Sequence, residues 1–419
     1  MKAILGFTVV GGVWLALSVV AAMASDQADT RYQVDAWDLP VAAGSLAPDL
    51  ALDAHGRMLL AWMERGPGQE RRVQLAIHTP ARVWASPRTV AQGTNLIANA
   101  VDTPHVLATP DGTVWVQWLA SSKAAAAGYD VMLARSGDQG EHWGPRITVN
   151  DDGLAAEHGF AALWPQGKDQ LGIVWLDGRE QAAAAAGSMP MHHGQGATQV
   201  RSNVFDPKLE RATDSVLDVR SCDCCQTTVA MTRRGPLLAW RDRDVDEVRD
   251  IVTARLSAST WGEGRSVHRD AWRIEACPVA GPALAAQGND VAVVWYTEAG
   301  GVPSLRLARS VDAGDRFQVP IGVDEGHAVL GRAAVAMDSA NIWVAWLREQ
   351  AGAQALMLAR YSSDMSQRLQ IIEVATLAAG GLASGYPRML SQGDGVYLVW
   401  TDVVDSAPQL RGVHVRRDE

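Results

Sequence analysis

The stretch Thr103-Pro104-His105-Val106-Leu107, followed after a polar turn by Val114-Trp115-Val116-Gln117-Trp118, decides the fold. It is one copy of a repeated unit: a short apolar strand, a turn, and a second strand that closes on tryptophan. The closing tryptophans recur at intervals of 51 to 65 residues, and they are Trp62, Trp118, Trp175, Trp240, Trp295, Trp346 and Trp400. Strand-rich repeats with a period of about 50 residues are typical of a β-propeller with one four-stranded blade per repeat. The sequence therefore predicts an all-β fold, and the tryptophan count favours seven blades.

The two ends of the chain are predicted to meet. The last repeat ends with its third strand, residues 410–416, so its outer strand must come from elsewhere. We expect residues 32–37 to supply it, which would hide both free sheet edges and make residues 25–419 a single domain. Helical periodicity is almost absent, so the alanine runs at 124–127 and 182–186 are predicted to be loop insertions.

Two repeats carry the same turn after the third strand. The turns are Ser136-Gly137-Asp138-Gln139-Gly140-Glu141-His142-Trp143 and Ser310-Val311-Asp312-Ala313-Gly314-Asp315-Arg316-Phe317. Asp suits a tight turn because it accepts backbone N–H groups, Gly because it tolerates a positive φ, and the aromatic ring can pack beneath the hairpin. The pattern resembles the Asp-box of the sialidase-like (BNR-repeat) propellers. In that family the turn is structural and distant from the ligand, and because sialidases have six blades, six is the alternative to seven.

Charged residues gather where one end of the central channel is expected. The inner strands and the loops after the second strands both reach that end of a propeller. The first set consists of residues expected to begin the inner strands: Asp49, His105, His158, Cys224, Cys225, Cys277, Arg332, Tyr386 and Arg388. The second set consists of residues that follow the closing tryptophans, including Glu64, 177–180, 241–244, Glu298, Arg348, Glu349 and Asp402. A concave face of acids and arginines is the default binding site. The alternation of Arg and acids over 241–251 leaves two interpretations open, an ion-pair network that fixes a loop or direct contact with the ligand.

The resemblance to sialidases implies specific roles on this face. A sialidase holds the substrate carboxylate with arginines and uses a tyrosine nucleophile assisted by glutamate and an aspartate acid/base. The candidates are Tyr386 (or Tyr296), Glu298 and Asp177 for catalysis, with Arg179, Arg241, Arg243, Arg332, Arg388 and Asp242 for substrate binding. The family's Arg-Ile-Pro motif is missing, because Pro48-Asp49-Leu50 stands at the first inner strand. We therefore expect this face to bind a glycan or protein ligand, with an exo-sialidase or related glycoside hydrolase as the alternative.

The segment Cys222-Asp223-Cys224-Cys225-Gln226-Thr227-Thr228 holds three of the four cysteines, and Cys277 occupies a similar place one repeat later. In an exported chain, cysteines indicate disulfides first, here one or two that staple the fourth and fifth blades. A Cu or Zn thiolate site with His105, His158 or His192 as further ligands, and a redox-active thiol, are the alternatives. They would give a periplasmic metal- or thiol-handling protein. Met189-Pro190-Met191-His192-His193 offers thioether and imidazole groups, which are also suitable ligands for copper. The cysteine segment 222–228, together with 241–251, Trp272 and Cys277-Pro278, resembles the corresponding parts of a group of exported bacterial sialidase-like proteins.

The N-terminal sequence and the overall composition indicate where the protein is located and which kinds of partner it can bind. Lys2, an apolar run over 4–20 and Ala22-Met23-Ala24 predict a signal peptide over 1–24 and hence a periplasmic or secreted protein, with an uncleaved membrane anchor as the alternative. The net charge of −10, with 37 basic and 47 acidic residues and no basic cluster, argues against a nucleic-acid partner. Nearly all the positive charge is arginine, which binds carboxylates better than lysine does.

Overall fold

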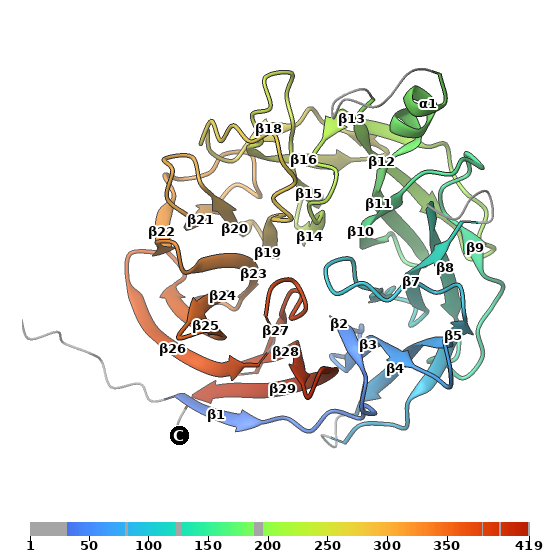
Figure 1. The fold of residues 1–419 in the computed structure, drawn as a ribbon, viewed down its shortest axis with the longest axis horizontal. Helices are drawn as coiled ribbons and strands as arrows, with labels where there is room; N and C mark the ends of the chain where they lie inside the picture. Colours follow the sequence, from blue (N-terminus) through green and yellow to red (C-terminus); the bar gives the residue numbers. More distant parts are fainter. Residues whose placement is uncertain are drawn as a thin grey trace, which may run out of the picture.

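The chain forms a seven-bladed β-propeller (Figure 1). A computed structural model describes residues 32–79, 83–122, 128–187, 196–378, 380–393 and 395–417. In these ranges, seven antiparallel sheets surround a central axis, so the seven-bladed prediction is confirmed and the six-bladed alternative is wrong. The predicted signal peptide, the 124–127 run and the 189–193 segment lie outside the described residues. No helix in the described ranges is long and apolar enough to cross a membrane.

Blades one to three are each built from four consecutive strands, and the first strand of each blade lies nearest the axis. Blade one contains β2 (Leu46–Leu52), β3 (Met58–Arg65), β4 (Arg71–His78) and β5 (Arg88–Gly93). Blade two contains β6 (His105–Ala108), β7 (Val114–Ser121), β8 (Tyr129–Ser136) and β9 (Ile147–Thr148). Blade three contains β10 (His158–Gln166), β11 (Gln170–Asp177), β12 (Thr198–Phe205) and β13 (Ser215–Ser221).

Blades four to six continue the ring in the same order. Blade four contains β14 (Thr228–Thr232), β15 (Gly235–Arg241), β16 (Ile251–Ser257), β17 (Thr260–Trp261) and β18 (Arg265–Ser266), so its outer edge is divided between two short strands. Blade five contains β19 (Ala283–Gln287), β20 (Asp290–Thr297), β21 (Ser304–Ser310) and β22 (Ile321–Glu325). Blade six contains β23 (Val329–Met337), β24 (Asn341–Gln350), β25 (Ala353–Ser362) and β26 (Arg368–Leu377).

The seventh blade joins the two ends of the chain. It contains β27 (Arg388–Gln392), β28 (Gly395–Val404) and β29 (Ala407–Arg417), and its outermost strand is β1 (Tyr32–Ala36). β1 pairs antiparallel with β29, from Tyr32 opposite Arg417 to Ala36 opposite Val413. The predicted closure is confirmed. It leaves β1 as an edge that runs along the outside of the ring (Figure 1).

In the described part of the chain, the hydrophobic core is divided into seven clusters, one between each pair of neighbouring blades. Each closing tryptophan is buried in the cluster that its own blade shares with the preceding one. Trp118 of blade two, for example, packs with Leu59 and Val73 of blade one, and Trp62 of blade one packs with Val399 of blade seven. The predicted tryptophan repeat is therefore a repeat of blade-to-blade contacts.

Three closing tryptophans also hydrogen-bond to the blade before them. The indole N–H groups of Trp240, Trp295 and Trp346 donate to Asp218, Asp270 and Asp324 at 2.6 to 2.8 Å. Each aspartate lies on the outer strand of the preceding blade or just after it. Buried indole N–H groups need such partners, so these bonds fix the angle between neighbouring blades.

The two predicted aspartate turns have the expected geometry. Asp138 accepts the amide of His142 at 2.9 Å and the hydroxyl of Ser136, and Asp312 makes the equivalent bonds to Arg316 and Ser310. Both turns join the third strand to the fourth, at the end of the channel opposite the starts of the inner strands. Their glycines are needed for two reasons. Gly140 and Gly314 have positive φ, and a Cβ at Gly314 would lie 2.3 Å from the side chain of Leu237 in the preceding blade.

The alanine run at 182–186 is not a loop, as the sequence had suggested, because it belongs to the helix α1 (Arg179–Gly187). Alanine has the highest intrinsic helix propensity, and the helix has a local start signal: the carboxylate of Asp177 accepts the amide of Arg179 at 3.1 Å. A helix this short shows too little periodicity to be recognised by pattern. It lies in the loop after β11, on the outer side of blade three (Figure 1).

Replacing Gly314 by Ala is expected to lower the free energy of unfolding by about 2 kcal/mol, because the new methyl group both strains a positive φ and collides with buried Leu237. Urea unfolding would measure the loss. Gly137→Ala is the matched control, since nothing lies within 4 Å of a Cβ there. A Gly314→Ala, Leu237→Ala double variant should lose less than the sum of its single changes. Strict additivity would contradict the proposed contact.

Candidate ligand site at the channel mouth

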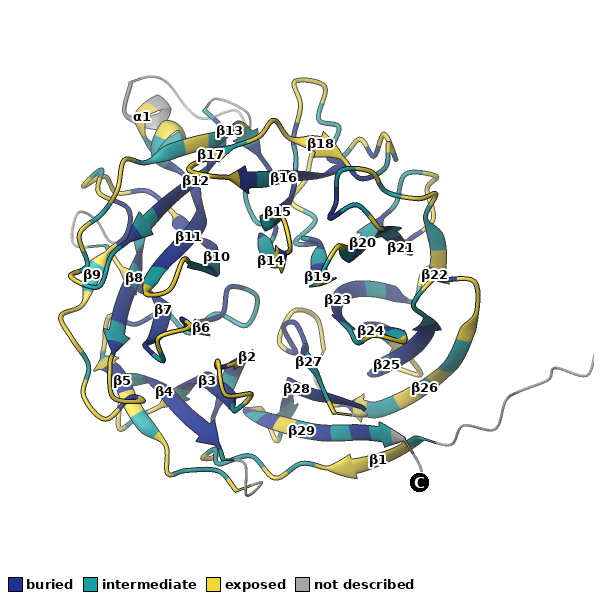
Figure 2. Cartoon of the chain, turned by 180° about the vertical axis from the view of Figure 1, so that it is seen from behind, coloured by how far each residue is buried: buried dark blue, intermediate teal, exposed yellow. Residues whose placement is uncertain are grey.

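A cavity of about 420 Å³ follows the axis, and all seven inner strands contribute to its wall. These strands are β2, β6, β10, β14, β19, β23 and β27, which lie nearest the centre in Figure 2. Small or apolar side chains line the deeper part, including Ala51, Ala162, Ala285, Ala334 and Met389. Polar side chains gather at the end where the inner strands begin, namely Asp49, His105, Gln226, Tyr386 and Arg388. We call this end the channel mouth.

Asp49 ties three blades together at the mouth. Its carboxylate accepts the amide of Val106 at 3.0 Å and lies 3.3 Å from Nδ1 of His105 and 3.4 Å from Nε of Arg388. Burial acts to raise the pKa of Asp49, but His105 and Arg388 outweigh it and hold that pKa below its usual value. Arg388 also donates to the hydroxyl of Thr103 at 2.6 Å. Part of the charge of Arg388 is therefore already balanced.

Arg332 is a buried cation next to the mouth, where it acts electrostatically on Tyr386. It lies in β23 at a bulge between Gly331 and Ala334, with a φ of 49°. Its guanidinium donates to Ser384 at 3.0 Å, and in the described part of the chain no carboxylate forms an ion pair with it; Glu349 acts on it only at longer range. Burial lowers the pKa of Arg332. A non-glycine residue with positive φ stores strain, which often marks a functional position.

Tyr386 lies among the arginines of the mouth. Only 5% of its surface is exposed, and its hydroxyl donates to the carbonyl of Val279. Burial raises the pKa of Tyr386, and the charges of Arg332, Arg241 and Arg388 oppose that shift. The predicted nucleophile is therefore a protonated phenol that donates a hydrogen bond. Three of the five predicted substrate arginines, Arg332, Arg241 and Arg388, lie close enough to act on it electrostatically.

Arg241 is held by the backbone around it. Its guanidinium donates to the carbonyls of Ala280, Arg249 and Tyr296, each at 2.7 Å, and its carbon Cζ lies 4.8 Å from the centre of the Trp272 ring. Burial lowers its pKa to about 10. These contacts join blade four to the loop that precedes blade five. They support a structural role for Arg241, and its predicted contact with substrate stays a prediction.

The loop after β15 contains an ion-pair network. Arg243 pairs with Glu247 at 2.7 Å and with Asp223 at 3.3 Å, and Glu247 also pairs with Arg249 at 2.9 Å. This is the first of the two interpretations that the sequence left open for 241–251. Asp242 is a different case, because burial and the neighbouring carboxylate of Asp218 raise its pKa to about 7.

Glu298, the second predicted catalytic residue, contacts Tyr296 instead of Tyr386. The Tyr296 hydroxyl donates to Oε1 of Glu298. Burial and this contact raise the pKa of Tyr296. Of the two tyrosines considered in the sequence, Tyr296 is the one that the structure pairs with a carboxylate.

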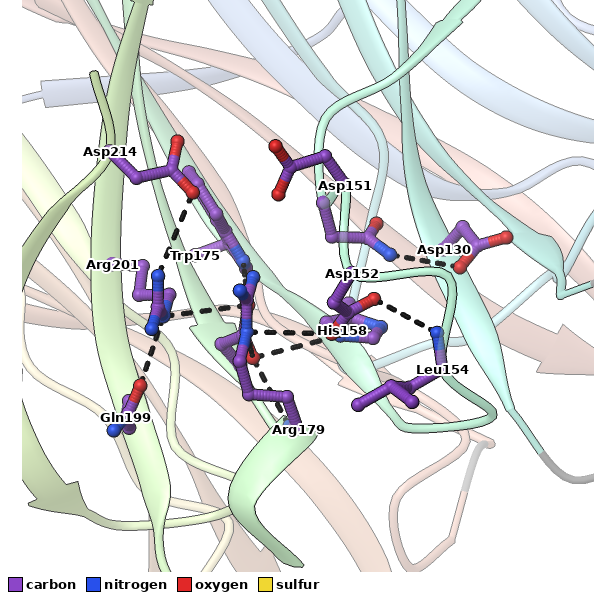
Figure 3. Close-up of polar contacts among 12 residues, drawn as sticks. Asp130, Asp151, Asp152, Leu154, His158, Trp175, Arg179, Gln199, Arg201 and Asp214 are labelled. Atoms are coloured by element: carbon purple, nitrogen blue, oxygen red, sulfur yellow. Dashed lines mark hydrogen bonds and ion pairs between the residues drawn. The ribbon is translucent and has the colours of Figure 1, made fainter. Parts of the chain in front are cut away.

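Asp177, the third predicted catalytic residue, lies in a separate buried cluster on blade three. Its partners Trp175, Arg179 and His158 are labelled in Figure 3. Arg179 binds it with two hydrogen bonds of 2.7 Å, and the indole of Trp175 donates to it at 2.8 Å. No contact among the described residues joins Asp177 to Tyr386 or Glu298, so the structure does not bring the three together. Arg179 is likewise paired away from the channel mouth.

His158 completes the blade-three cluster as a cation. Its Nε2 lies 2.9 Å from Asp152 and its Nδ1 lies 3.1 Å from the carbonyl of Tyr129. Both partners accept hydrogen bonds, so both ring nitrogens carry protons. Burial alone would lower the pKa of His158, but Asp152 and Asp177 outweigh it and raise that pKa. Asp152, His158 and Asp177 have the donor types of a metal site, yet His158 has no lone pair left to offer.

Asp102 is a residue of interest that sequence reasoning missed. One carboxylate oxygen accepts the amide of Phe160 at 2.8 Å, and the other is buried without a partner in the described part of the chain. Burial raises the pKa of Asp102 to about 7, although the Phe160 amide and Arg388 oppose the shift. Its place just before His105, at the start of an inner strand, was the available signal.

All four cysteines form disulfides, Cys222 with Cys225 and Cys224 with Cys277. The second bond joins the loop before blade four to the loop before blade five, which is the predicted staple. Residues 222–227 form a loop between β13 and β14, with a turn at 223 and 224. Cys277 also lies six residues before β19, so it does not begin the inner strand. The disulfides occupy every thiol that the alternative metal site would need.

Comparisons with known proteins add the following. No protein-family model matches the chain, and no curated protein matches it in sequence. Among solved structures, a Hadza microbial sialidase is 17% identical over 72% of this chain and 63% of its own, with a TM-score of 0.43, so this chain spans less than two thirds of that protein. A PL25 ulvan lyase is 13% identical over 78% of each chain (TM-score 0.44), and the phage phi92 endosialidase is 9% identical over 93% and 70% (TM-score 0.49). Likenesses this distant do not identify a reaction.

His158→Gln is expected to cost about 3 kcal/mol of unfolding free energy at pH 6, because it removes one charge from a buried ion-pair cluster. The pKa of His158 is raised in the folded state. Its contribution to stability is therefore complete below the pKa of about 6.5 in the unfolded state, and it is lost as the pH rises through the pKa of the folded state. Urea unfolding of both proteins from pH 5.5 to 9 would measure the difference. A difference that stayed constant or grew with pH would show that His158 is not an imidazolium.

Proposed function

We propose that the channel mouth binds an anionic saccharide, with its carboxylate or sulfate held by Arg332 and Arg388. The observation that carries the proposal is Arg332, a buried guanidinium to which no described carboxylate is paired. Burying an uncompensated charge is costly, and an anion that enters the mouth would offset that cost. Arg388 lines the cavity, and its ion pair with Asp49 is a loose 3.4 Å contact.

The cavity supports a sugar as the carrier of that anion. Its volume of about 420 Å³ lies within the usual range for small-molecule sites. The deeper wall of alanines and Met389 is suited to the C–H faces of a sugar ring. Gln226 and Tyr386 at the mouth can hydrogen-bond to hydroxyl groups. A neutral sugar would fill the same space without balancing the charge of Arg332, so the proposal requires that the acidic sugar bind more tightly.

Isothermal titration with 3′-sialyllactose, an oligosaccharide of glucuronate and rhamnose 3-sulfate, and lactose would test this proposal. The two acidic probes carry a carboxylate, and only the second carries a sulfate. At least one acidic probe is expected to bind, and lactose to bind at least tenfold more weakly, because a charge-assisted bond contributes about 1.5–3 kcal/mol. Equal binding of lactose, or no binding of any probe, would refute the proposal.

Arg332→Gln is expected to weaken binding of the acidic probe at least tenfold and to leave lactose binding unchanged, because only the anion contacts the guanidinium. Arg411→Gln, an exposed position on β29, is the matched control and should bind as the unaltered protein does. Thermal unfolding of each variant would check that the fold is kept. If Arg332→Gln bound the acidic probe as well as Arg411→Gln does, Arg332 would not be the anion's partner.

Glycoside hydrolysis is a second candidate, favoured by the contact between Tyr296 and Glu298. A carboxylate that already accepts the phenol's hydrogen bond is placed to take its proton when the oxygen attacks. A fluorogenic sialoside should then be turned over, and Tyr296→Phe should abolish turnover, while Tyr386→Phe should retain part of it. Absence of turnover over a broad glycoside panel would leave the binding function alone.

A further inference from the structure

The two disulfides differ in how a reagent can reach them. Cys222 and Cys225 are each only 1% exposed, so the bond between them is closed to an external thiol. Cys277 is exposed and Cys224 is half-buried, so the Cys224–Cys277 bond is open to solvent. A reductant must therefore attack the Cys277 side of the second bond first.

The buried disulfide is nevertheless within reach of Cys224. The sulfur atoms of Cys222, Cys224 and Cys225 all lie within 4.8 Å of one another. A Cys224 thiolate released from Cys277 would thus be next to the buried bond without any large movement of the loop. Attack on Cys225 would join neighbouring residues, whose Cα atoms are only about 3.8 Å apart, below the usual disulfide range. Attack on Cys222 avoids that strain.

A positive charge lies beside the sulfur that would be attacked. Nη1 of Arg249 is 3.6 Å from Sγ of Cys222, and Glu247 holds the same guanidinium at 2.9 Å. Thiol–disulfide exchange passes through a transition state whose negative charge is shared by three sulfur atoms, and it requires a thiolate. A nearby guanidinium stabilises thiolates and such anions.

We propose that the cysteine cluster is a two-step acceptor of electrons from a dithiol, with Cys224 as the internal relay. In the first step, a dithiol partner attacks Cys277 Sγ and expels the Cys224 thiolate. The partner's second thiol then releases Cys277 as a thiol and leaves the partner as a disulfide. In the second step, the Cys224 thiolate attacks Cys222 Sγ, forms a Cys222–Cys224 bond and expels the Cys225 thiolate, which takes up a proton. The second step is an exchange within the chain and consumes no electrons; a second dithiol would reduce the new bond.

Limited reduction with one equivalent of dithiothreitol, followed by acid quench and N-ethylmaleimide labelling, tests the relay in the unaltered protein. Trypsin separates Cys277 from the other three cysteines, because Arg220 and Arg233 bracket Cys222, Cys224 and Cys225. Fragment spectra then place each label. The relay predicts labels on Cys277 and Cys225. Labels on Cys277 and Cys224 alone would overturn it, because the exchange within the chain would not have occurred.

Three variants separate the relay from simple accessibility. In Cys224→Ser, the Cys222–Cys225 bond should resist the dithiothreitol that reduces it in the unaltered protein, and reduction at an equal rate would refute the relay. Arg249→Gln should slow the appearance of label on Cys225 about tenfold through the lost charge–sulfur contact. Arg269→Gln, an exposed position in the same loop as Cys277, is the matched control and should not change the rate. An unchanged rate in Arg249→Gln would remove the electrostatic part of the mechanism.

Discussion

One buried tryptophan per blade holds this ring together. Each of the seven closing tryptophans fills the apolar cluster between its own blade and the preceding one, so no blade has a complete core by itself. Apolar burial is therefore gained only when neighbouring blades meet, and the hydrogen bonds from Trp240, Trp295 and Trp346 to aspartates of the preceding blade add direction to that contact. The pairing of β1 with β29 in blade seven closes the ring, which also requires the first and last blades to share a cluster.

The closed ring of blades determines which charged residues meet at the channel mouth. Because seven inner strands begin at one end, residues far apart in the chain such as Asp49, Tyr386 and Arg388 lie around one opening. Arg332 lies close enough to act electrostatically on Tyr386. Because little water reaches the mouth, the electrostatic interactions of any unbalanced charge there are stronger than they would be in water. Asp49 contacts His105 and pairs with Arg388, and main-chain carbonyls hold Arg241. Among the described residues, Arg332 donates to the neutral hydroxyl of Ser384 and forms no ion pair. The proposed anionic ligand is the missing partner in that arrangement.

The cysteine loops connect this mouth to the ion-pair network of Arg243, Glu247 and Arg249. The Cys224–Cys277 bond fixes the segment that carries Val279 and Ala280, whose carbonyls accept bonds from Tyr386 and Arg241. On the other side, Arg243, Glu247 and Arg249 link Asp223 to the sulfur of Cys222. The covalent and ionic contacts therefore restrain the same two loops, and both loops face the channel.

The amino-acid sequence by itself determined the number of blades, their order, the closure by the N-terminal strand and the end at which polar residues gather. These follow from local patterns: a tryptophan that closes a strand, an aspartate turn, an unpaired last repeat. A third turn, Ser362 to Asp364, was missed because serine stands where the other two have glycine, although Ser362 donates to Asp364 in the same way. The helix at Arg179 was missed because it is too short for a periodic pattern.

Only the tertiary structure decided which charged residues are partners. Asp177 lies two residues after Trp175 and Glu298 lies three residues after Trp295, yet Arg179 and His158 enclose the first and Tyr296 binds the second. The raised pKa of Asp102 depends on its burial, with one carboxylate oxygen left without a partner among the described residues. Repeat position sets which end of the channel a residue occupies, because the backbone path is periodic. Charge pairing depends on distances of a few ångströms between side chains of different blades, and no local pattern encodes those distances.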